Sequence, residues 1–241
     1  MLKIKNSKRA SGHIEIVLSF VIFISFIIFL FSVFPVYQTK KSEVGLDSAE
    51  RGIINFTSVS VNYFSLVLEE SAGCFSYPSQ DLSSKIIVRN FEGVRVNAKS
   101  LGGIWYIKDA GNGNFYGIYY SSEFSEEGYD AFDQTEGCDD LAGQDISYRV
   151  GLARTDNLIS YDKAVNLTYR YNLNYGELKG NFSLPAGENF GFGINDLKGK
   201  IILNTSNKRP ERTTVLSRNK PIQMVYQNGT YVFGMLNTQT W

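Results

Sequence analysis

The feature that most constrains this chain is an uninterrupted apolar run near its N-terminus. Residues 16–36 contain no charged side chain. As a helix they would extend about 30 Å, because each helical residue adds about 1.5 Å, and this length matches the hydrocarbon core of a bilayer. The apolar part of most signal peptides is shorter, at about 7–15 residues. We therefore expect a transmembrane helix over residues 16–36.

Basic residues on the two flanks of this run predict its orientation. Four precede the run and two follow it, namely Lys3, Lys5, Lys8 and Arg9, then Lys40 and Lys41. Because the flank with more Lys and Arg usually stays in the cytoplasm, the N-terminus is expected inside the cell. Residues 38–241 are then expected outside, attached to the lipid bilayer by the helix.

The residues just before the apolar run form a processing pattern. The basic pair Lys8 and Arg9 precedes the small residue Ala10, and Glu15 stands five positions after Ala10. These residues resemble the class III, or prepilin-type, signal sequence of archaeal type IV pilin-like precursors. The resemblance implies that a prepilin peptidase cleaves after Ala10, so that Ser11 becomes the new N-terminus.

The resemblance also implies a role for Glu15 in assembly. Cleavage after Ala10 makes residues 1–10 a leader and Glu15 the fifth mature residue, whereas cleavage after Gly12 would make it the third and depart from the pattern. The family retains its apolar helix as an anchor or filament core, where a carboxylate is costly unless it is paired. The N-terminal amine of a neighbouring subunit would be its partner.

An ordinary membrane anchor explains the same residues without processing. In that interpretation the chain keeps its leader, and Glu15 lies at the membrane interface. There its negative charge complements the N-terminal end of the helix dipole. Both interpretations predict one membrane-spanning helix, and they differ in whether the helix drives self-association.

A helical stalk is expected to follow the membrane span and to end at about residue 51. A narrow apolar stripe, with intervals of three or four residues, is formed by Leu46, Ala49, Ile53 and Phe56. This spacing is typical of a helix. We expect the stripe to pack on the protein's own domain or on neighbouring helices, and the anchor and stalk together to cover residues 11–52.

Beyond the stalk the apolar period changes to alternation, which indicates strands. Alternation begins near Thr57, and short β-like runs follow at 85–89, 93–98, 104–108, 115–120, 146–152, 164–173 and 200–203. Aromatic residues, at 14% of the chain, favour the same structure. We expect residues 53–241 to form one mainly β ectodomain, a β-sandwich, which makes the whole chain α+β by content.

Two glycine-containing segments are expected to be hairpin turns. Asn228-Gly229, between the runs 221–227 and 230–235, is typical of a type I′ turn. Residues 109–114 read Asp-Ala-Gly-Asn-Gly-Asn, which fits neither a phosphate-binding P-loop nor an EF-hand. A hairpin turn is therefore favoured there over a phosphate or calcium loop.

The charges balance overall but are unevenly distributed. The net charge is zero, which gives no support for nucleic-acid binding. Nine acidic residues fall within positions 123–145, and seven basic residues accompany one acid over positions 198–220. Two solvated loops are the favoured interpretation, and opposed patches that bring copies of the domain head to tail are the alternative.

Calcium is the metal that the acidic segment suggests, because it takes about six to eight oxygen ligands. The candidate ligands are Asp130, Asp133, Asp139 and Asp140. Their spacing lacks the alternating acids and the glycine of a calcium loop, so a solvated loop is favoured over a metal site.

Cysteines and glycosylation motifs agree with an extracellular domain. Cys74 and Cys138 would both lie outside the membrane, where a single disulfide between them is favoured over two free buried thiols. Asn-x-Ser/Thr occurs at Asn55, Asn166, Asn181, Asn204 and Asn228. These five asparagines are candidate glycosylation sites.

Catalytic chemistry is not supported by the residues available. The one histidine, His13, lies at the edge of the apolar run, so the ectodomain lacks the base of a Ser-His-Asp triad or of a catalytic cysteine. Paired carboxylates of a glycosidase remain a weak alternative. We expect no enzymatic activity and no cofactor, with calcium the one metal suggested.

Two functions follow from these observations. The resemblance implies a pilin-like membrane-anchored surface protein, a main or minor subunit of a type IV pilus-like filament or of a pseudopilin assembly, with its own copies or other pilin-like subunits as partners. The alternative is a single-pass anchored extracellular binding module, adhesin-like, that takes calcium or a glycan.

Overall fold

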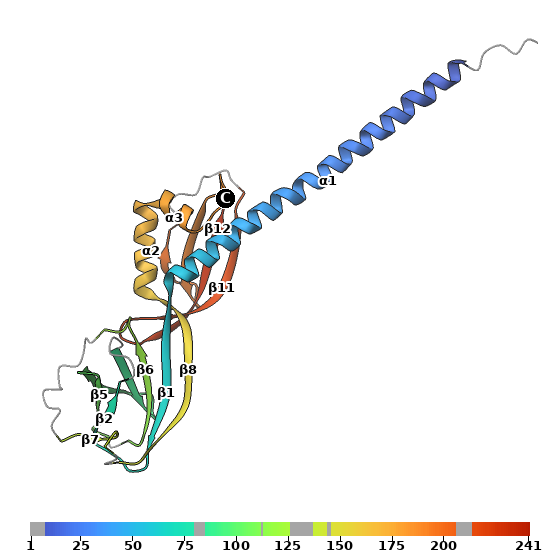
Figure 1. The fold of residues 1–241 in the computed structure, drawn as a ribbon. Helices are drawn as coiled ribbons and strands as arrows, with labels where there is room; N and C mark the ends of the chain where they lie inside the picture. Colours follow the sequence, from blue (N-terminus) through green and yellow to red (C-terminus); the bar gives the residue numbers. More distant parts are fainter. Residues whose placement is uncertain (1–7, 80–84, 112, 126–136, 144–145, 206–213) are drawn as a thin grey trace, which may run out of the picture.

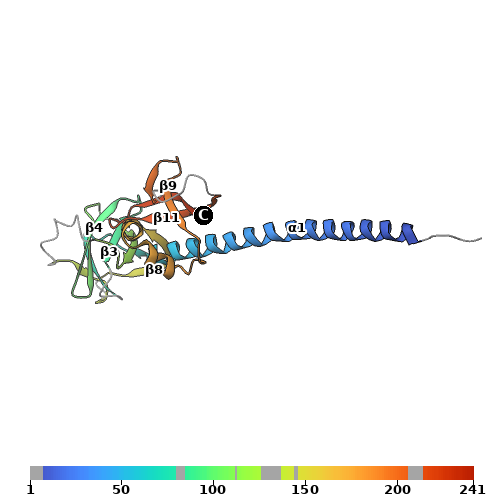
Figure 2. The ribbon, with the colours of Figure 1, turned by 90° about the horizontal axis from the view of Figure 1, so that it is seen from above.

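A computed structural model describes residues 8–79, 85–111, 113–125, 137–143, 146–205 and 214–241, with the backbone alone described at 8–14 and 33–42. One long helix leads into a domain of strands and two shorter helices (Figure 1). Seen from above, the N-terminal part of the long helix projects well beyond the domain (Figure 2).

The long helix, α1 (Lys8–Thr57), has 50 residues and two different environments. Its window Glu15–Ser32 has a mean hydropathy of 2.6, with none of it buried. By length and composition this segment could be a membrane anchor or a signal sequence. The C-terminal part packs against the domain, where Ala49 and Ile53 are almost completely buried.

The helix ends later than the sequence suggested. We expected an end near residue 51, but α1 continues to Thr57. Burial of Ile53 fixes the extra turn, and two hydroxyl groups support its last carbonyls. Thr57 Oγ1 donates to the Ile53 carbonyl at 2.7 Å, and Ser58 Oγ donates to the Ile54 carbonyl at 2.6 Å.

Within the described ranges, twelve strands and two helices follow α1. The strands are β1 (Ser58–Leu68), β2 (Cys74–Pro78), β3 (Lys85–Asn90), β4 (Arg95–Leu101), β5 (Ile104–Lys108), β6 (Phe115–Ser121), β7 (Asp139–Asp140), β8 (Tyr148–Ser160), β9 (Phe190–Asp196), β10 (Ile201–Asn204), β11 (Leu216–Val225) and β12 (Tyr231–Thr240). The helices α2 (Tyr161–Leu173) and α3 (Tyr175–Asn181) lie between β8 and β9.

The strands form one open mixed sheet in the order β10-β9-β12-β11-β8-β1-β6-β3-β4-β5-β2-β7. Most neighbours are antiparallel, while β8 with β11 and β2 with β7 are parallel. The long strands β1 and β8 connect the two halves of this sheet, and α1 runs directly into β1 (Figure 1). The chain is therefore α+β, as expected, but the expected β-sandwich is not shown.

The half of the sheet far from α1 bends over on itself. β4 pairs with β3 through Arg95 and Val96 and with β5 through its later residues, so the sheet turns at this strand. As a result, Trp105 of β5 and Phe75 of β2 share a buried cluster with Leu66 of β1. This cluster is the core of the distal part of the domain.

The half of the sheet next to α1 is covered on one face by helices. Its buried core combines α1, α2 and α3 with β9, β11 and β12, and includes Ile53, Leu167, Leu178, Phe190, Phe192, Met224 and Leu236. We expected a mainly β domain over residues 53–241, and the two helices α2 and α3 in this half were not anticipated.

The main error concerns residues 164–173, which we expected to be a strand and which lie in α2. Ser160 caps this helix, because its hydroxyl accepts a hydrogen bond from the backbone N–H of Lys163 at 3.3 Å. Ala164, Leu167 and Tyr171 are its buried residues, at helical spacing. The cap and this apolar face outweigh the strand propensity of the β-branched and aromatic residues in the segment.

The expected turn at Asn228-Gly229 differs from the prediction in detail. The β11–β12 hairpin is present, but Tyr226 N–H donates to the Thr230 carbonyl, which leaves a loop of three residues. Gly229 has a φ of 73°, whereas a type I′ turn also needs a positive φ at Asn228. Among the described non-glycine residues, Ser183 alone has a positive φ.

Residues 109–114 do not form a hairpin, because they connect β5 to β6 and these strands are not neighbours in the sheet. β3 and β4 lie between them. The Asp109 carboxylate, which is 7% exposed, holds the described part of this connection. Its two oxygens accept from the backbone N–H of Gly111 at 2.9 Å and of Gly113 at 3.4 Å.

Candidate functional site

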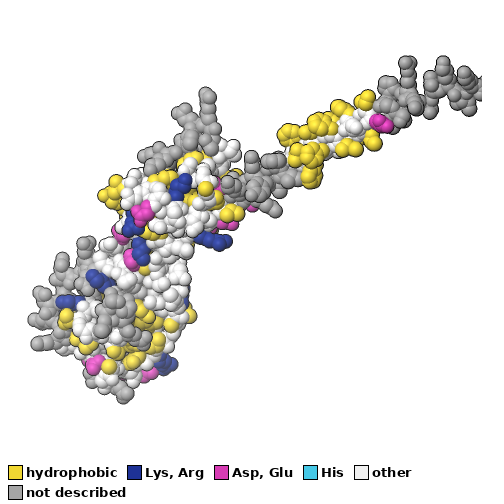
Figure 3. All heavy atoms as spheres, turned by 45° about the horizontal axis from the view of Figure 1, so that its top comes forward, with side chains coloured by type: hydrophobic (Ala, Val, Ile, Leu, Met, Phe, Trp, Pro, Cys, Tyr) yellow, Lys and Arg dark blue, Asp and Glu magenta, His cyan; other side chains and the backbone are white. Residues whose placement is uncertain are grey.

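The apolar half of α1 is the first candidate site. Large hydrophobic side chains are exposed around it, for example Ile16 at 68% and Phe20 at 63%. Figure 3 shows such side chains gathered on the visible face of the projecting helix. Exposed apolar surface on this scale marks contact with lipid or with other proteins. Glu15 lies exposed at its N-terminal end.

The processing residues of the sequence analysis lie next to this segment. Lys8, Arg9, Ala10 and Ser11 belong to the first turns of α1, but their side chains are outside the described part. The structure therefore places their backbone in α1 ahead of Glu15. Cleavage after Ala10 and pairing of Glu15 with an amine stay predictions.

Burial at the junction between α1 and the domain confirms the predicted apolar stripe. Leu46, Ala49 and Ile53 are all at most 4% exposed, and Phe56 packs against the same core while partly exposed. Gly52 lies on this face, where the ring of Phe182 occupies the space that a Cβ atom would need. The stripe thus packs on the protein's own domain, one of the two surfaces that we expected.

Ion pairs reinforce this junction. Arg218 Nη1 lies 2.6 Å from Asp47 Oδ1 and 3.4 Å from Glu50 Oε2, and Lys220 Nζ lies 2.9 Å from Glu50 Oε1. The hydrogen bond to Asp47 raises the pKa of Arg218 above its ordinary value. Part of the basic segment 198–220 therefore contacts acids of α1 within the same chain. Residues 206–213 of that segment lie outside the described part.

The disulfide between Cys74 and Cys138 is present, as expected, with a Cα–Cα separation of 4.7 Å. It joins the first residue of β2 to the residue before β7. The two short strands pair next to it through Phe75 with Asp139 and Ser76 with Asp140.

The candidate calcium ligands are only partly described. Asp130 and Asp133 lie outside the described residues. Asp139 and Asp140 are exposed in β7, and Asp140 Oδ1 accepts from Ser76 Oγ at 3.2 Å and from the Ala142 N–H at 3.0 Å. Within the described ranges, no group of three or more His, Cys, Asp or Glu side chains could hold a metal. Calcium binding stays a prediction.

All five asparagines of the glycosylation motifs are exposed. They are spread over α1, α2, α3, β10 and the hairpin loop, as Asn55, Asn166, Asn181, Asn204 and Asn228 respectively. The loop residue has a second role, because Asn228 Oδ1 accepts from the Thr230 N–H at 3.0 Å. The exposure of these side chains agrees with glycosylation. Glycosylation itself stays a prediction.

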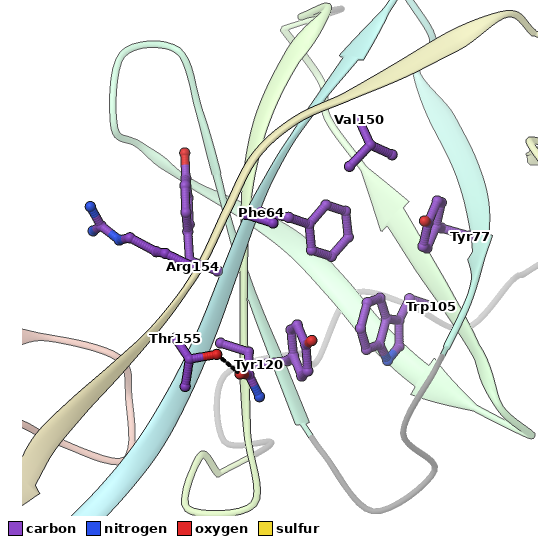
Figure 4. A pocket seen from close by; sticks show the side chains of 10 residues that line it. Phe64, Tyr77, Trp105, Tyr120, Val150, Arg154 and Thr155 are labelled. Carbon is purple, nitrogen blue, oxygen red and sulfur yellow. Dashed lines mark hydrogen bonds between the residues drawn. The ribbon is translucent and has the colours of Figure 1, made fainter.

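A cavity of about 320 Å³ in the distal half of the domain was not anticipated from the sequence. Its lining residues come from five strands and are Asn62, Tyr63, Phe64, Tyr77, Trp105, Tyr120, Val150, Ala153, Arg154 and Thr155. Figure 4 shows β1 and β8 side by side along one wall, with Tyr77 and Trp105 on the opposite side. The cavity thus lies where the bent sheet brings β2 and β5 over β1 and β8.

Four aromatic side chains are among the ten residues that line this cavity. Phe64 lies with its ring centroid 5.5 Å from that of Tyr77 and 6.3 Å from that of Trp105. Trp105 and Tyr120 are 5.3 Å apart. Trp105 is 1% exposed, and within the described chain its Nε1–H has no hydrogen-bond acceptor. Burial raises the pKa of the Tyr77 phenol above its ordinary value.

Neutral polar groups lie at the other end of the cavity. Thr155 Oγ1 donates to Asn62 Oδ1 at 2.7 Å, drawn as the dashed line in Figure 4. The charged Arg154 side chain extends away from Phe64, Tyr77 and Trp105 (Figure 4). It lies over the Tyr63 ring at 5.1 Å and pairs with Asp156 at 3.0 Å.

A β-bulge between β1 and β8 shapes the cavity wall that these two strands form. The β1–β8 register shifts between Phe64 and Leu66, where β8 carries one extra residue. Such bulges re-aim side chains and are common beside functional sites. The aromatic content, 14% of the chain, is the one feature of the sequence that could have indicated this cavity. Periodicity within single strands could not show which rings meet, because the sheet must first bend.

The comparisons with known proteins give no further assignment: no family model, no curated protein and no solved structure matches this chain.

Proposed function

We propose that this chain is a pilin-like, membrane-anchored surface protein, a main or minor subunit of an archaeal type IV pilus-like filament or pseudopilin assembly. The observation that carries the proposal is the division of α1. Residues 16–32 expose their apolar side chains, while Leu46, Ala49 and Ile53 are buried against the domain. An apolar helix that its own domain leaves uncovered needs lipid or other helices as partners.

Glu15 gives the helix a means of specific assembly. A carboxylate among packed apolar helices is costly unless it is paired. Cleavage after Ala10 by a prepilin peptidase would place a new amine at Ser11, and that amine on a neighbouring subunit would neutralise Glu15. The pair would set the register between helices, because a shifted helix would leave the carboxylate unpaired.

Two features of the domain support its location outside the cell. The Cys74–Cys138 disulfide is typical of oxidising compartments. The five asparagines of the glycosylation motifs are exposed. With the N-terminus in the cytoplasm, the domain would be displayed on the surface as a structural component without enzymatic activity.

The first test is the N-terminal residue of the mature protein, measured by mass spectrometry of the terminal peptide from native membranes. We expect Ser11. A start at Met1 or Leu2 would leave Glu15 without the proposed amine and would contradict the pilin-like assignment. The chain would then be a single-pass anchored binding module, a function that the aromatic cavity favours.

Glu15→Ala is expected to reduce the assembled fraction at least about tenfold, because the variant loses the proposed charge pair, while the protein stays in the membrane. The assembled fraction is measured by sedimentation after crosslinking of native membranes. Glu43→Ala is the matched control, since Glu43 is an exposed acid of the same helix. Unchanged self-association of Glu15→Ala, or an equal loss in both variants, would contradict the role of Glu15.

A further inference from the structure

We propose that the aromatic cavity between β1, β8, β5 and β2 is a binding site for a neutral saccharide. The inference concerns the distal half of the domain and does not depend on processing or assembly of α1. It rests on the shape of the cavity, on the side chains that line it and on the charges that are directed away from it.

The aromatic wall suits one face of a sugar ring. A pyranose has an apolar face of C–H groups, and the face of an aromatic ring carries partial negative charge that attracts such groups. Phe64, Tyr77, Trp105 and Tyr120 present four rings to one space. Because these rings are held by contacts with one another, the wall is formed before a ligand arrives.

The polar end suits hydroxyl groups. Asn62 and Thr155 bond to each other and keep further donor and acceptor capacity, since an amide has two N–H donors and a hydroxyl has two lone pairs. A purely apolar ligand would leave these polar groups unsatisfied on burial.

The charges favour a neutral ligand. Arg154, the one charged residue lining the described cavity, directs its guanidinium toward Tyr63 and Asp156. A charged ligand group would therefore be buried without a counter-charge, which is costly. The volume, about 320 Å³, lies at the small end of the range for ligand sites. The cavity therefore takes one or two sugar units.

The site is accessible from β8. Ala153 and Val150 line the cavity and are exposed, the latter at 50%. A saccharide would enter over these two residues, with its apolar face toward Phe64 and Trp105. The end unit of a longer glycan would fit the same arrangement.

Tryptophan fluorescence of the full chain in lipid nanodiscs tests the proposal, with no sugar-based detergent present. The probes are maltose, cellobiose, lactose and N,N′-diacetylchitobiose. We expect saturable quenching by at least one of them. The signal should persist in Trp241→Phe and disappear in Trp105→Phe, because Trp241 lies over Gly191 in the other half of the sheet. Absence of binding by all four would overturn the proposal.

A pair of neighbouring substitutions on β8 locates the site. Ala153→Phe places a ring in the mouth of the cavity and should weaken binding at least about tenfold. Leu152→Phe is the control, because Leu152 is exposed and does not line the cavity. Equal affinity in the two variants would overturn the assignment to this cavity. Tighter binding of choline or glucuronate than of the neutral sugars would overturn the ligand class.

Discussion

Replacing Cys74 and Cys138 together with serine is expected to lower the free energy of unfolding of the domain by about 2–4 kcal/mol. The disulfide closes a loop with a sequence separation of 64. Its loss therefore increases the conformational entropy of the unfolded chain. The native state loses a contact as well. β7 has two residues and leads to Leu141, which is 1% exposed in the distal core, so the bridge holds this buried side chain in place.

Urea unfolding of the full chain in nanodiscs, followed by circular dichroism, measures this effect. The native protein under reducing conditions should unfold like the double variant, and the variant itself should not respond to reductant. A midpoint that is the same for the oxidised native protein and the double variant would contradict a stabilising role for the bridge.

Gly52→Ala is expected to destabilise the domain by about 1–3 kcal/mol, although helix propensity alone predicts the opposite sign. Alanine is favoured over glycine inside a helix by about 1 kcal/mol. At this position, however, the new methyl group would meet the ring of Phe182, which is 7% exposed and packed within the core. The ring or the helix must move, and both are fixed by the surrounding contacts.

Gly176→Ala is the matched control for this substitution. Gly176 lies in α3, and a Cβ atom there would meet nothing within 4 Å. The control should therefore be neutral or slightly stabilising in the same urea experiment. Stabilisation by both substitutions would show that α1 does not pack closely on Phe182.

The sequence predicted those parts of the fold that depend on neighbouring residues. The apolar helix, its buried stripe at Ala49 and Ile53, and the strand β5 at 104–108 follow from local periodicity. The disulfide was predictable because two cysteines allow one intramolecular pair. The hairpin β11–β12 was located by Asn228-Gly229, although its turn type was wrong.

The remaining features depend on contacts between distant segments. Residues 164–173 have the alternating pattern of a strand, and the Ser160 cap together with the core beside α1 makes them a helix. The connection at 109–114 was assigned to a hairpin because β5 and β6 are consecutive, yet β3 and β4 intervene in the sheet. The aromatic cavity likewise exists only after the sheet bends at β4.

The direct continuation of α1 into β1 determines how the protein carries mechanical load. α1 ends at Thr57 and β1 begins at Ser58, so tension on α1 passes into a strand without an intervening loop. That strand is hydrogen-bonded on both sides, to β6 and to β8. Pulling β1 out of the sheet must break its pairing with β8 from Ser58 onward and, from Asn62 onward, its pairing with β6 as well. A domain attached in this way resists extraction by a force that acts along its own tether.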